Sequence, residues 1–177
     1  KHVLFSHGFG FVWLSQTVGN RTLFIADFKT RAKDMFYQNW NSTLHNSTRY
    51  VLYREFKSLL EPEKYLFEIV DYKFRRSLVK FRCGLLRLRI NEGRWHQVDR
   101  SVRICPVCRN GIEDELHFLV VCPFYNDLRT IYLPQIIYGT MNEFINVVNT
   151  EDKYLLKKMC QYIYYAYEKR GIKLSSL

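Results

Sequence analysis

The sequence predicts a mostly α-helical protein that contains one small turn-and-helix module. Two observations predict this fold class. Apolar residues recur at helical spacing in several segments, and cysteine and histidine residues cluster in one short stretch with the spacing of metal ligands. The chain has 177 residues and is 47% hydrophobic, which is enough to bury a substantial core and excludes a disordered chain.

Amphipathic helices are expected on both sides of the central part of the chain. Apolar side chains alternate with charges over residues 23–45 and again over residues 48–60, where Ser47 is a candidate N-cap. Residues 141–149 and 151–170 are expected to form two closing helices. Residues 123–138 are expected to contain another helix, which begins or kinks at Pro123.

The domain organisation follows from these elements. Residues 1–70 are expected to form an N-terminal helical, linker-like segment, in which the Gly-broken aromatic residues 8–14 are either a strand or an anchoring segment. Residues 71–177 are expected to hold a basic helix, the cysteine–histidine cluster and the closing helices. Packing of both parts as a single domain is the alternative.

The positive charge of the chain is concentrated in its centre. The net charge is +10, and residues 73–109 carry +9 of it, with eleven cations against only Glu92 and Asp99. Such an excess favours a polyanionic partner or an anionic membrane surface. Because no apolar run is long enough to span a membrane and no signal peptide is evident, we expect an intracellular protein, nuclear or cytoplasmic, in a reducing compartment.

Helical spacing extends through the first part of this basic stretch. Five apolar residues recur at spacings of 4, 3, 4 and 3: Phe74, Leu78, Phe81, Leu85 and Leu88. They predict a helix over residues 73–89, with Asp71 as the N-cap, residues 91–93 as the stop, and cations on both flanks of the buried stripe. The candidate nucleic-acid-binding residues are Lys73, Arg75, Arg76, Lys80, Arg82, Arg87, Arg89, Arg94, Arg100 and Arg103. The alternative is that these long side chains only cover apolar neighbours.

A metal site is predicted directly after the basic stretch. The pattern Cys105-x2-Cys108-x8-His117-x4-Cys122 offers four sulfur or nitrogen donors, the last two from a helix expected to begin near Glu113. Thiolate-rich tetrahedral sites select Zn²⁺, whereas an iron–sulfur cluster normally needs four cysteines. Four protein ligands leave no open position, so we expect a structural zinc ion. The alternative is three buried thiols and a core histidine.

The other cysteines and the C-terminal tyrosines have simpler interpretations. Cys83 and Cys160 lack ligand spacing and are expected to be buried, apolar-type residues. Four tyrosines near the C-terminus cannot share one helix face: Tyr162, Tyr164, Tyr165 and Tyr167. Packing on a partner is the more common use of such a helix, and base stacking is the alternative.

Catalysis by this chain is not expected. It has no Gly-rich phosphate loop, no paired Asp motif suited to two-metal polymerisation, and no nucleophile elbow.

A family resemblance covers roughly residues 8–170. The residues over 80–84, 92–94, 103–108 and 112–129 resemble the zinc region near the C-terminal end of the reverse-transcriptase proteins of animal non-LTR retrotransposons. The resemblance implies zinc binding at the four donors and a role in holding template RNA or target DNA. It does not imply polymerase or endonuclease activity, because the residues for either are absent. An upstream polymerase domain of the same parent is then a possible partner, and a host protein derived from such a remnant is the alternative origin.

These observations lead to one functional hypothesis and one alternative. We expect a non-catalytic zinc domain that grips RNA or DNA by its backbone, with little sequence preference unless Trp95 or His96 stacks on an unpaired base. The alternative is a zinc-stabilised protein-interaction module that binds an acidic partner.

Overall fold

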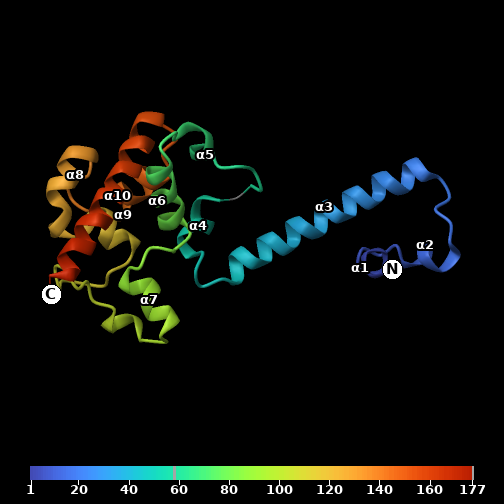
Figure 1. Ribbon diagram of the computed structural model, residues 1–177, viewed down its shortest axis with the longest axis horizontal. Helices are drawn as coiled ribbons and strands as arrows, with labels where there is room; N and C mark the ends of the chain where they lie inside the picture. Colours follow the sequence, from blue (N-terminus) through green and yellow to red (C-terminus); the bar gives the residue numbers. More distant parts are fainter. Residues whose placement is uncertain (58, 177) are drawn as a thin grey trace. The chain divides into compact units, whose positions relative to one another are not determined.

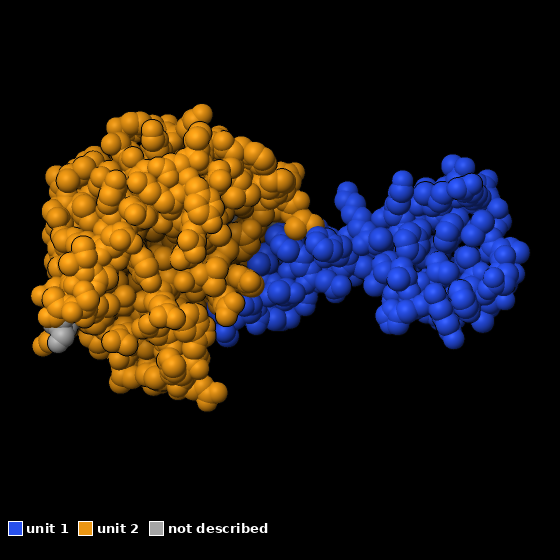
Figure 2. Space-filling view, in the orientation of Figure 1, with its two compact units in different colours: residues 1–48 blue, residues 49–177 orange. Residues whose placement is uncertain are grey.

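The structure, a computed structural model, describes residues 1–57 and 59–176 and divides into two compact units, residues 1–48 and 49–177 (Figures 1 and 2). The expected mostly helical fold class is confirmed. Within the described residues, the only β pairing is an isolated antiparallel bridge between Ile104 and Ile112. The boundary predicted at residue 70 lies instead between Thr48 and Arg49, because residues such as Tyr65 belong to the core of the second unit.

The first unit consists of two short helices and one long helix, α1 (His2–Ser6), α2 (Gly10–Ser15) and α3 (Arg21–Asn46) (Figure 1). The strand considered for residues 8–14 is therefore wrong, whereas the helix predicted over residues 23–45 is confirmed. Asn20 caps α3 by accepting a hydrogen bond from the backbone N–H of Leu23. The ring of Phe9 lies 5.5 Å from those of Phe24 and Phe28, which holds the start of α2 against α3.

The second unit is a bundle of short helices around one long C-terminal helix. Its elements are α4 (Val51–Phe56), α5 (Tyr65–Glu68), α6 (Tyr72–Arg82), α7 (Arg89–Trp95), the 3₁₀ turn η1 (Arg100–Val102), the π-helical turn η2 (His117–Val121), the 3₁₀ turn η3 (Pro123–Tyr125), α8 (Asn126–Tyr132), α9 (Met141–Val148) and α10 (Lys153–Ser175).

The two closing helices are confirmed as α9 and α10, and two other predicted helices are shorter than expected. Ser47 ends α3 and does not cap α4, whose N-cap is Tyr50. Over the predicted range 123–138, only Asn126–Tyr132 is α-helical, after a 3₁₀ turn that starts at Pro123. Proline at the start of a helix is tolerated because the first N–H groups of a helix have no partner within it.

The core of the second unit forms where α10 packs against α6 and α8 (Figure 1). Leu78 from α6, Phe118 from η2, and Met159 and Ile163 from α10 are fully buried. Tyr162 is also buried, and its hydroxyl donates to the Phe118 carbonyl at 2.9 Å. This bond satisfies a polar group that would otherwise be costly to bury.

The basic helix ends earlier than its apolar spacing predicts. Helix α6 stops at Arg82, not at residue 89, and the chain turns at Gly84, which has a φ of +62°. A Cβ at Gly84 would lie 2.8 Å from the Arg49 carbonyl oxygen, so the turn requires glycine. Leu85 is consequently 42% exposed. Residues 91–93, expected to stop the helix, lie inside α7.

Candidate metal centre

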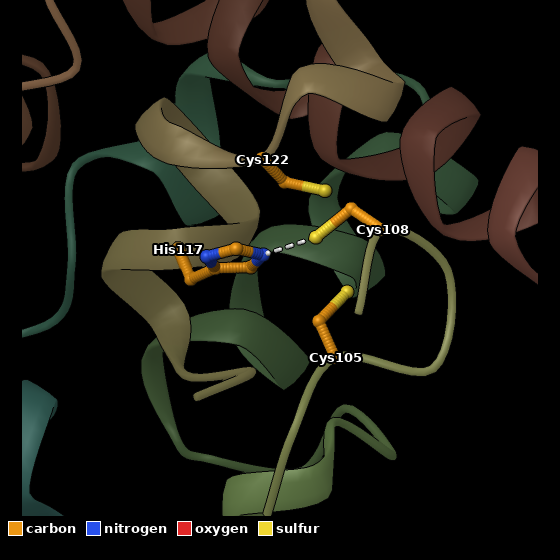
Figure 3. A group of neighbouring side chains, drawn as sticks. All are labelled: Cys105, Cys108, His117 and Cys122. Atoms are coloured by element: carbon orange, nitrogen blue, oxygen red, sulfur yellow. Dashed lines mark hydrogen bonds between the residues drawn. The ribbon is translucent and has the colours of Figure 1, made fainter. Parts of the chain in front are cut away.

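The four predicted ligands come together in the second unit. Figure 3 shows the side chains of Cys105, Cys108, His117 and Cys122 pointing toward one another, and their donor atoms all lie within 4.8 Å of one another. Cys108 Sγ lies 3.2 Å from His117 Nε2. Cys105, His117 and Cys122 are buried, and Cys108 is half-buried. The predicted donor cluster is therefore confirmed, and its arrangement can hold a metal ion.

A tight turn positions the first two donors. The bridge between Ile104 and Ile112 closes it, the Cys105 N–H donates to the Gly111 carbonyl at 2.9 Å, and the Arg109 N–H donates to the Cys105 carbonyl at 2.9 Å. Arg109 and Gly111 have φ values of +56° and +88°. These left-handed residues reverse the chain, so that the thiols of Cys105 and Cys108 face the same side.

A π-helical turn positions the other two donors. In an α-helix, five residues correspond to about 500° of rotation, which would leave the side chains of His117 and Cys122 about 140° apart. The Cys122 N–H instead donates to the His117 carbonyl at 2.7 Å, and this i to i+5 bond widens the turn so that both donors share one side. Pro123 follows directly and disfavours a helical conformation at Cys122, where the turn ends.

Glu113 and Asp114 lie before the helical residues, which begin at residue 115 and not near Glu113 as predicted. The Asp114 carboxylate accepts from the backbone N–H of His117 at 2.9 Å and so caps the helical residues that begin at 115 and lead into the π-helical turn. Glu113, expected near the start of this helix, is only 1% exposed. Its carboxylate accepts from Arg170 Nε at 2.7 Å and Nη2 at 2.8 Å, and also from the Arg89 backbone N–H at 2.8 Å.

We call residues 104–113, which carry Cys105 and Cys108, the metal loop. The buried ion pair of Glu113 and Arg170 joins this loop to α10, and the bond from Arg89 joins it to α7. Glu113 Oε1 lies 3.9 Å from Cys105 Sγ, while Arg170 belongs to α10 and Arg89 begins α7. The Glu113 carbonyl also accepts from the Ile90 N–H at 3.0 Å. Sequence reasoning missed Arg170, because a contact across 57 residues leaves no local signal.

The electrostatics of the thiols favour one negative charge before any cation is present. A hydrogen bond from the Cys122 thiol lowers the pKa of Cys105 to about 3. The same bond raises the pKa of Cys122, and burial raises that of Cys108. One thiolate is therefore shared among closely packed thiols. Ionising the other two requires a nearby positive charge, which a bound metal ion provides.

The predicted nucleic-acid-binding residues fall into three groups. Lys73, Arg76, Arg87, Arg89 and Arg100 are exposed, Arg75, Lys80, Arg94 and Arg103 are half-buried, and Arg82 is buried. The three half-buried arginines donate hydrogen bonds within the fold. Arg75 donates to the carbonyls of Leu66 and Ile69, Arg94 to the Asn91 side chain, and Arg103 to the carbonyls of Ile90 and Val98.

Arg82 has a structural role and does not reach an external ligand, so its assignment to a nucleic-acid contact is wrong. It donates to Glu63 Oε2 at 2.9 Å and to the Val148 carbonyl at 2.9 Å, and its side chain is 7% exposed. The sequence placed Arg82 on the flank of an apolar stripe. The partners that bury it lie 19 and 66 residues away, which helical periodicity does not predict.

Cys83 is half-buried and Cys160 is buried, and burial raises the pKa of both thiols, that of Cys160 to about 12. Both therefore remain neutral, and the prediction of a buried cysteine is confirmed for Cys160, whereas Cys83 is only half-buried.

Comparisons of the chain with protein-family models, with curated proteins and with solved structures find no match. Among the helices of the described residues, none combines the length and the apolar character needed to cross a membrane.

Proposed function

We propose that residues 49–177 form a non-catalytic zinc domain that binds the sugar–phosphate backbone of RNA or DNA. The observation that carries this proposal is a set of exposed cations over residues 73–100 that directly precedes, in the sequence, a mostly buried cluster of four metal donors. The zinc domain of a non-LTR retrotransposon reverse transcriptase, or of a protein derived from one, is the parent class that the sequence resemblance supports.

Zinc is the metal that this donor set fits best. Three thiolates and one imidazole are soft or borderline ligands, and Zn²⁺ binds such sets tetrahedrally without further ligands. Ligand distances of about 2.0–2.3 Å separate the donors of such a site by roughly 3.3–3.8 Å, and the four donors here, which lie within 4.8 Å of one another, would need to move inward by about 1 Å or less. Cys105, Cys108 and Cys122 would bind through sulfur and His117 through Nε2. The ion would stabilise the fold and, with no open position, would not activate water.

Metal analysis of the purified chain tests this part of the proposal. Inductively coupled plasma mass spectrometry is expected to find about one zinc per chain, and Cys108→Ser, which removes one ligand, is expected to lower that content. Cys83→Ser is the matched control, because Cys83 lies outside the cluster. Zinc content that is zero in the wild type, or equally low in both variants, would refute the zinc assignment.

The exposed cations support binding to phosphates. Arg76 lies on α6, and Arg87 and Arg89 lie where the chain passes from α6 to α7. Arg89 has an acidic neighbour at the surface, Glu92 at 3.5 Å, an exposed pair that contributes little. Arginine binds phosphate oxygens with its planar fork, and the energy of such contacts comes mainly from counterion release.

Binding measured at several salt concentrations tests this part. We expect the triple variant Arg76→Gln, Arg87→Gln, Arg89→Gln to bind duplex DNA more weakly, and log K to fall less steeply with log salt, by about 2–3 in slope. The control carries the same charge change in the first unit, at the exposed residues Arg21, Lys29 and Lys33. Fluorescence anisotropy measures both proteins, and equal losses in both would contradict the assignment.

A second candidate function rests on apolar exposure beside the metal loop. Trp95, Val98, Val102 and Ile104 are between 39% and 62% exposed, which favours a protein-interaction surface. An acidic protein partner would then meet the neighbouring arginines. The absence of any binding to RNA or DNA at low salt would favour this candidate.

A further inference from the structure

A row of side chains along α10 forms a second surface, in which two tyrosines are exposed and one lysine is half-buried. Tyr154, Lys158 and Tyr165 are spaced by four and seven residues, so they lie on one face of the helix. Tyr154 is 70% and Tyr165 is 37% exposed. Of the four C-terminal tyrosines considered in the sequence, Tyr165 alone is this open, because Tyr162 is buried and Tyr164 and Tyr167 are half-buried.

Neighbouring helices extend this row. Tyr132 from α8 stacks on Tyr165, with ring centroids 5.6 Å apart and planes inclined by 17°. Lys158 Nζ lies 5.5 Å from the ring centroids of both Tyr132 and Tyr154. From α6, Phe74 lies 5.9 Å from Tyr165, and its ring carries Lys73 Nζ at 4.8 Å.

The acidic residues at the start of α10 are engaged elsewhere. Asp152 caps the helix by accepting from the Leu155 N–H at 2.6 Å, and Glu151 pairs with Lys64 at 3.0 Å. The ammonium groups of Lys73 and Lys158 therefore remain beside the rings, and neither has a carboxylate partner among the described ion pairs.

We propose that this surface, the tyrosine–lysine face (Lys73, Tyr132, Tyr154, Lys158 and Tyr165), binds single-stranded nucleic acid by stacking unpaired bases on its rings. The inference rests on the proposed nucleic-acid function and adds its substrate class. Exposed rings offer flat apolar surfaces to bases of any sequence, and the ammonium groups beside them attract the phosphates that connect those bases. A duplex hides the faces of its bases, so it gains only the contribution from the lysines.

The distance between the two exposed rings along α10 can be spanned by a short single strand. Eleven residues separate Tyr154 from Tyr165, which places them about 16 Å apart along the helix axis. Lys158 lies between them in sequence, so one strand that follows the face meets ring, cation and ring in turn. The charge of the face and its separated, partly exposed rings favour a single strand over an apolar protein partner, which needs a continuous contact surface.

The test compares single-stranded and duplex binding by zinc-loaded full chains. The probes are a fluorescein-labelled 20-nucleotide oligo(dT) and a labelled 20-base-pair duplex. Stacking of one base on an aromatic ring makes a contribution of about fivefold or more to affinity, so Tyr154→Leu with Tyr165→Leu is expected to weaken oligo(dT) binding at least 20-fold. Duplex binding is expected to change less than about twofold.

Two further variants separate stacking from other effects. Tyr154→Phe with Tyr165→Phe retains both rings and is expected to bind oligo(dT) like the wild type. Tyr154→Leu alone is the variant that cannot disturb the core, since Tyr154 is 70% exposed, and about a fivefold loss is expected.

The outcomes distinguish this inference from the proposed function. If the wild type binds both probes and the double leucine variant retains its affinity for oligo(dT), the tyrosine–lysine face does not stack bases, and the proposed function is unaffected. Equal losses on both probes, or a loss in the phenylalanine variant, also overturn stacking. If the wild type binds neither probe, the proposed function and this inference fail together.

Discussion

Replacing Arg170 by methionine tests the buried ion pair beside the metal loop. Arg170 is 5% and Glu113 is 1% exposed, and two hydrogen bonds of 2.7 and 2.8 Å join them. Methionine fills much of the same volume but leaves the Glu113 carboxylate buried without its cation. Removing one partner of a buried pair costs about 3–5 kcal/mol. For a unit of this size, each kcal/mol corresponds to about 3–5 °C in Tm, so a decrease of about 10–20 °C is expected.

A thermal melt followed by circular dichroism measures this decrease, with zinc present throughout. Lys169→Met is the matched control, because Lys169 pairs with the 59%-exposed side chain of Asp127 and donates to the Phe124 carbonyl, contacts that together contribute about 1–2 kcal/mol, less than the buried pair. Adding Glu113→Gln to Arg170→Met removes the uncompensated charge and retains an oxygen for the Arg89 N–H. That double variant is expected to recover at least half of the lost Tm. A single variant that melts within about 3 °C of the wild type refutes the reasoning.

Three further perturbations have defined outcomes. Chelation with EDTA at pH 7 is expected to lower the Tm of the second unit, because metal binding contributes to folding; an unchanged melt, or one that added zinc does not restore, would contradict this. Three backbone N–H groups, those of Thr140, Ile137 and Tyr138, hold the pKa of Glu143 at about 2, below its ordinary 4.5. The stabilisation of the fold by the Glu143 carboxylate is therefore complete above pH 4.5 and is lost as the pH falls toward 2. The Tm difference between the wild type and Glu143→Gln should be smaller at pH 3 than at pH 6. A difference that is the same at both pH values would show that the ionised carboxylate does not stabilise the fold. Gly84→Ala is expected to destabilise by about 1–3 kcal/mol in urea unfolding, whereas Gly171→Ala, whose Cβ meets nothing within 4 Å, should stabilise by up to about 1 kcal/mol; the same sign in both would be the contrary result.

Sequence reasoning identified the features that depend on local spacing. Four metal donors within 18 residues and the helices α3, α9 and α10 follow from patterns that neighbouring residues determine. Even so, the geometry at His117 and Cys122 differs from the expected α-helix. A spacing of five residues fits one side of a helix only when the turn widens, and the Cys122 N–H bond to His117 provides that widening.

Features that depend on distant contacts could not be predicted in this way. The apolar spacing of α6 continues to Leu88, and Leu88 is indeed buried. The chain nevertheless turns at Gly84, between the end of α6 and Leu88. Apolar spacing predicts that a residue is buried, but it does not predict whether the helix continues as far as that residue. For the same reason Arg82 was predicted to contact nucleic acid, although Glu63, far along the chain, pairs with it in the interior, and the buried pair of Glu113 with Arg170 was not predicted.

The connections of Glu113 indicate how a metal ion bound at the four donors would affect surfaces that it does not touch. Cys105, next to Glu113 in space, belongs to the metal loop, and Arg170 belongs to the helix that carries Tyr165 on another face. Arg89, the first residue of α7, donates its backbone N–H to Glu113, and its side chain is one of the exposed arginines. A metal ion that fixes the loop therefore fixes the position of Glu113, which in turn holds α7 and α10. For this reason, loss of the metal should weaken phosphate binding and base stacking together, whereas the arginine and tyrosine variants should each weaken one of them.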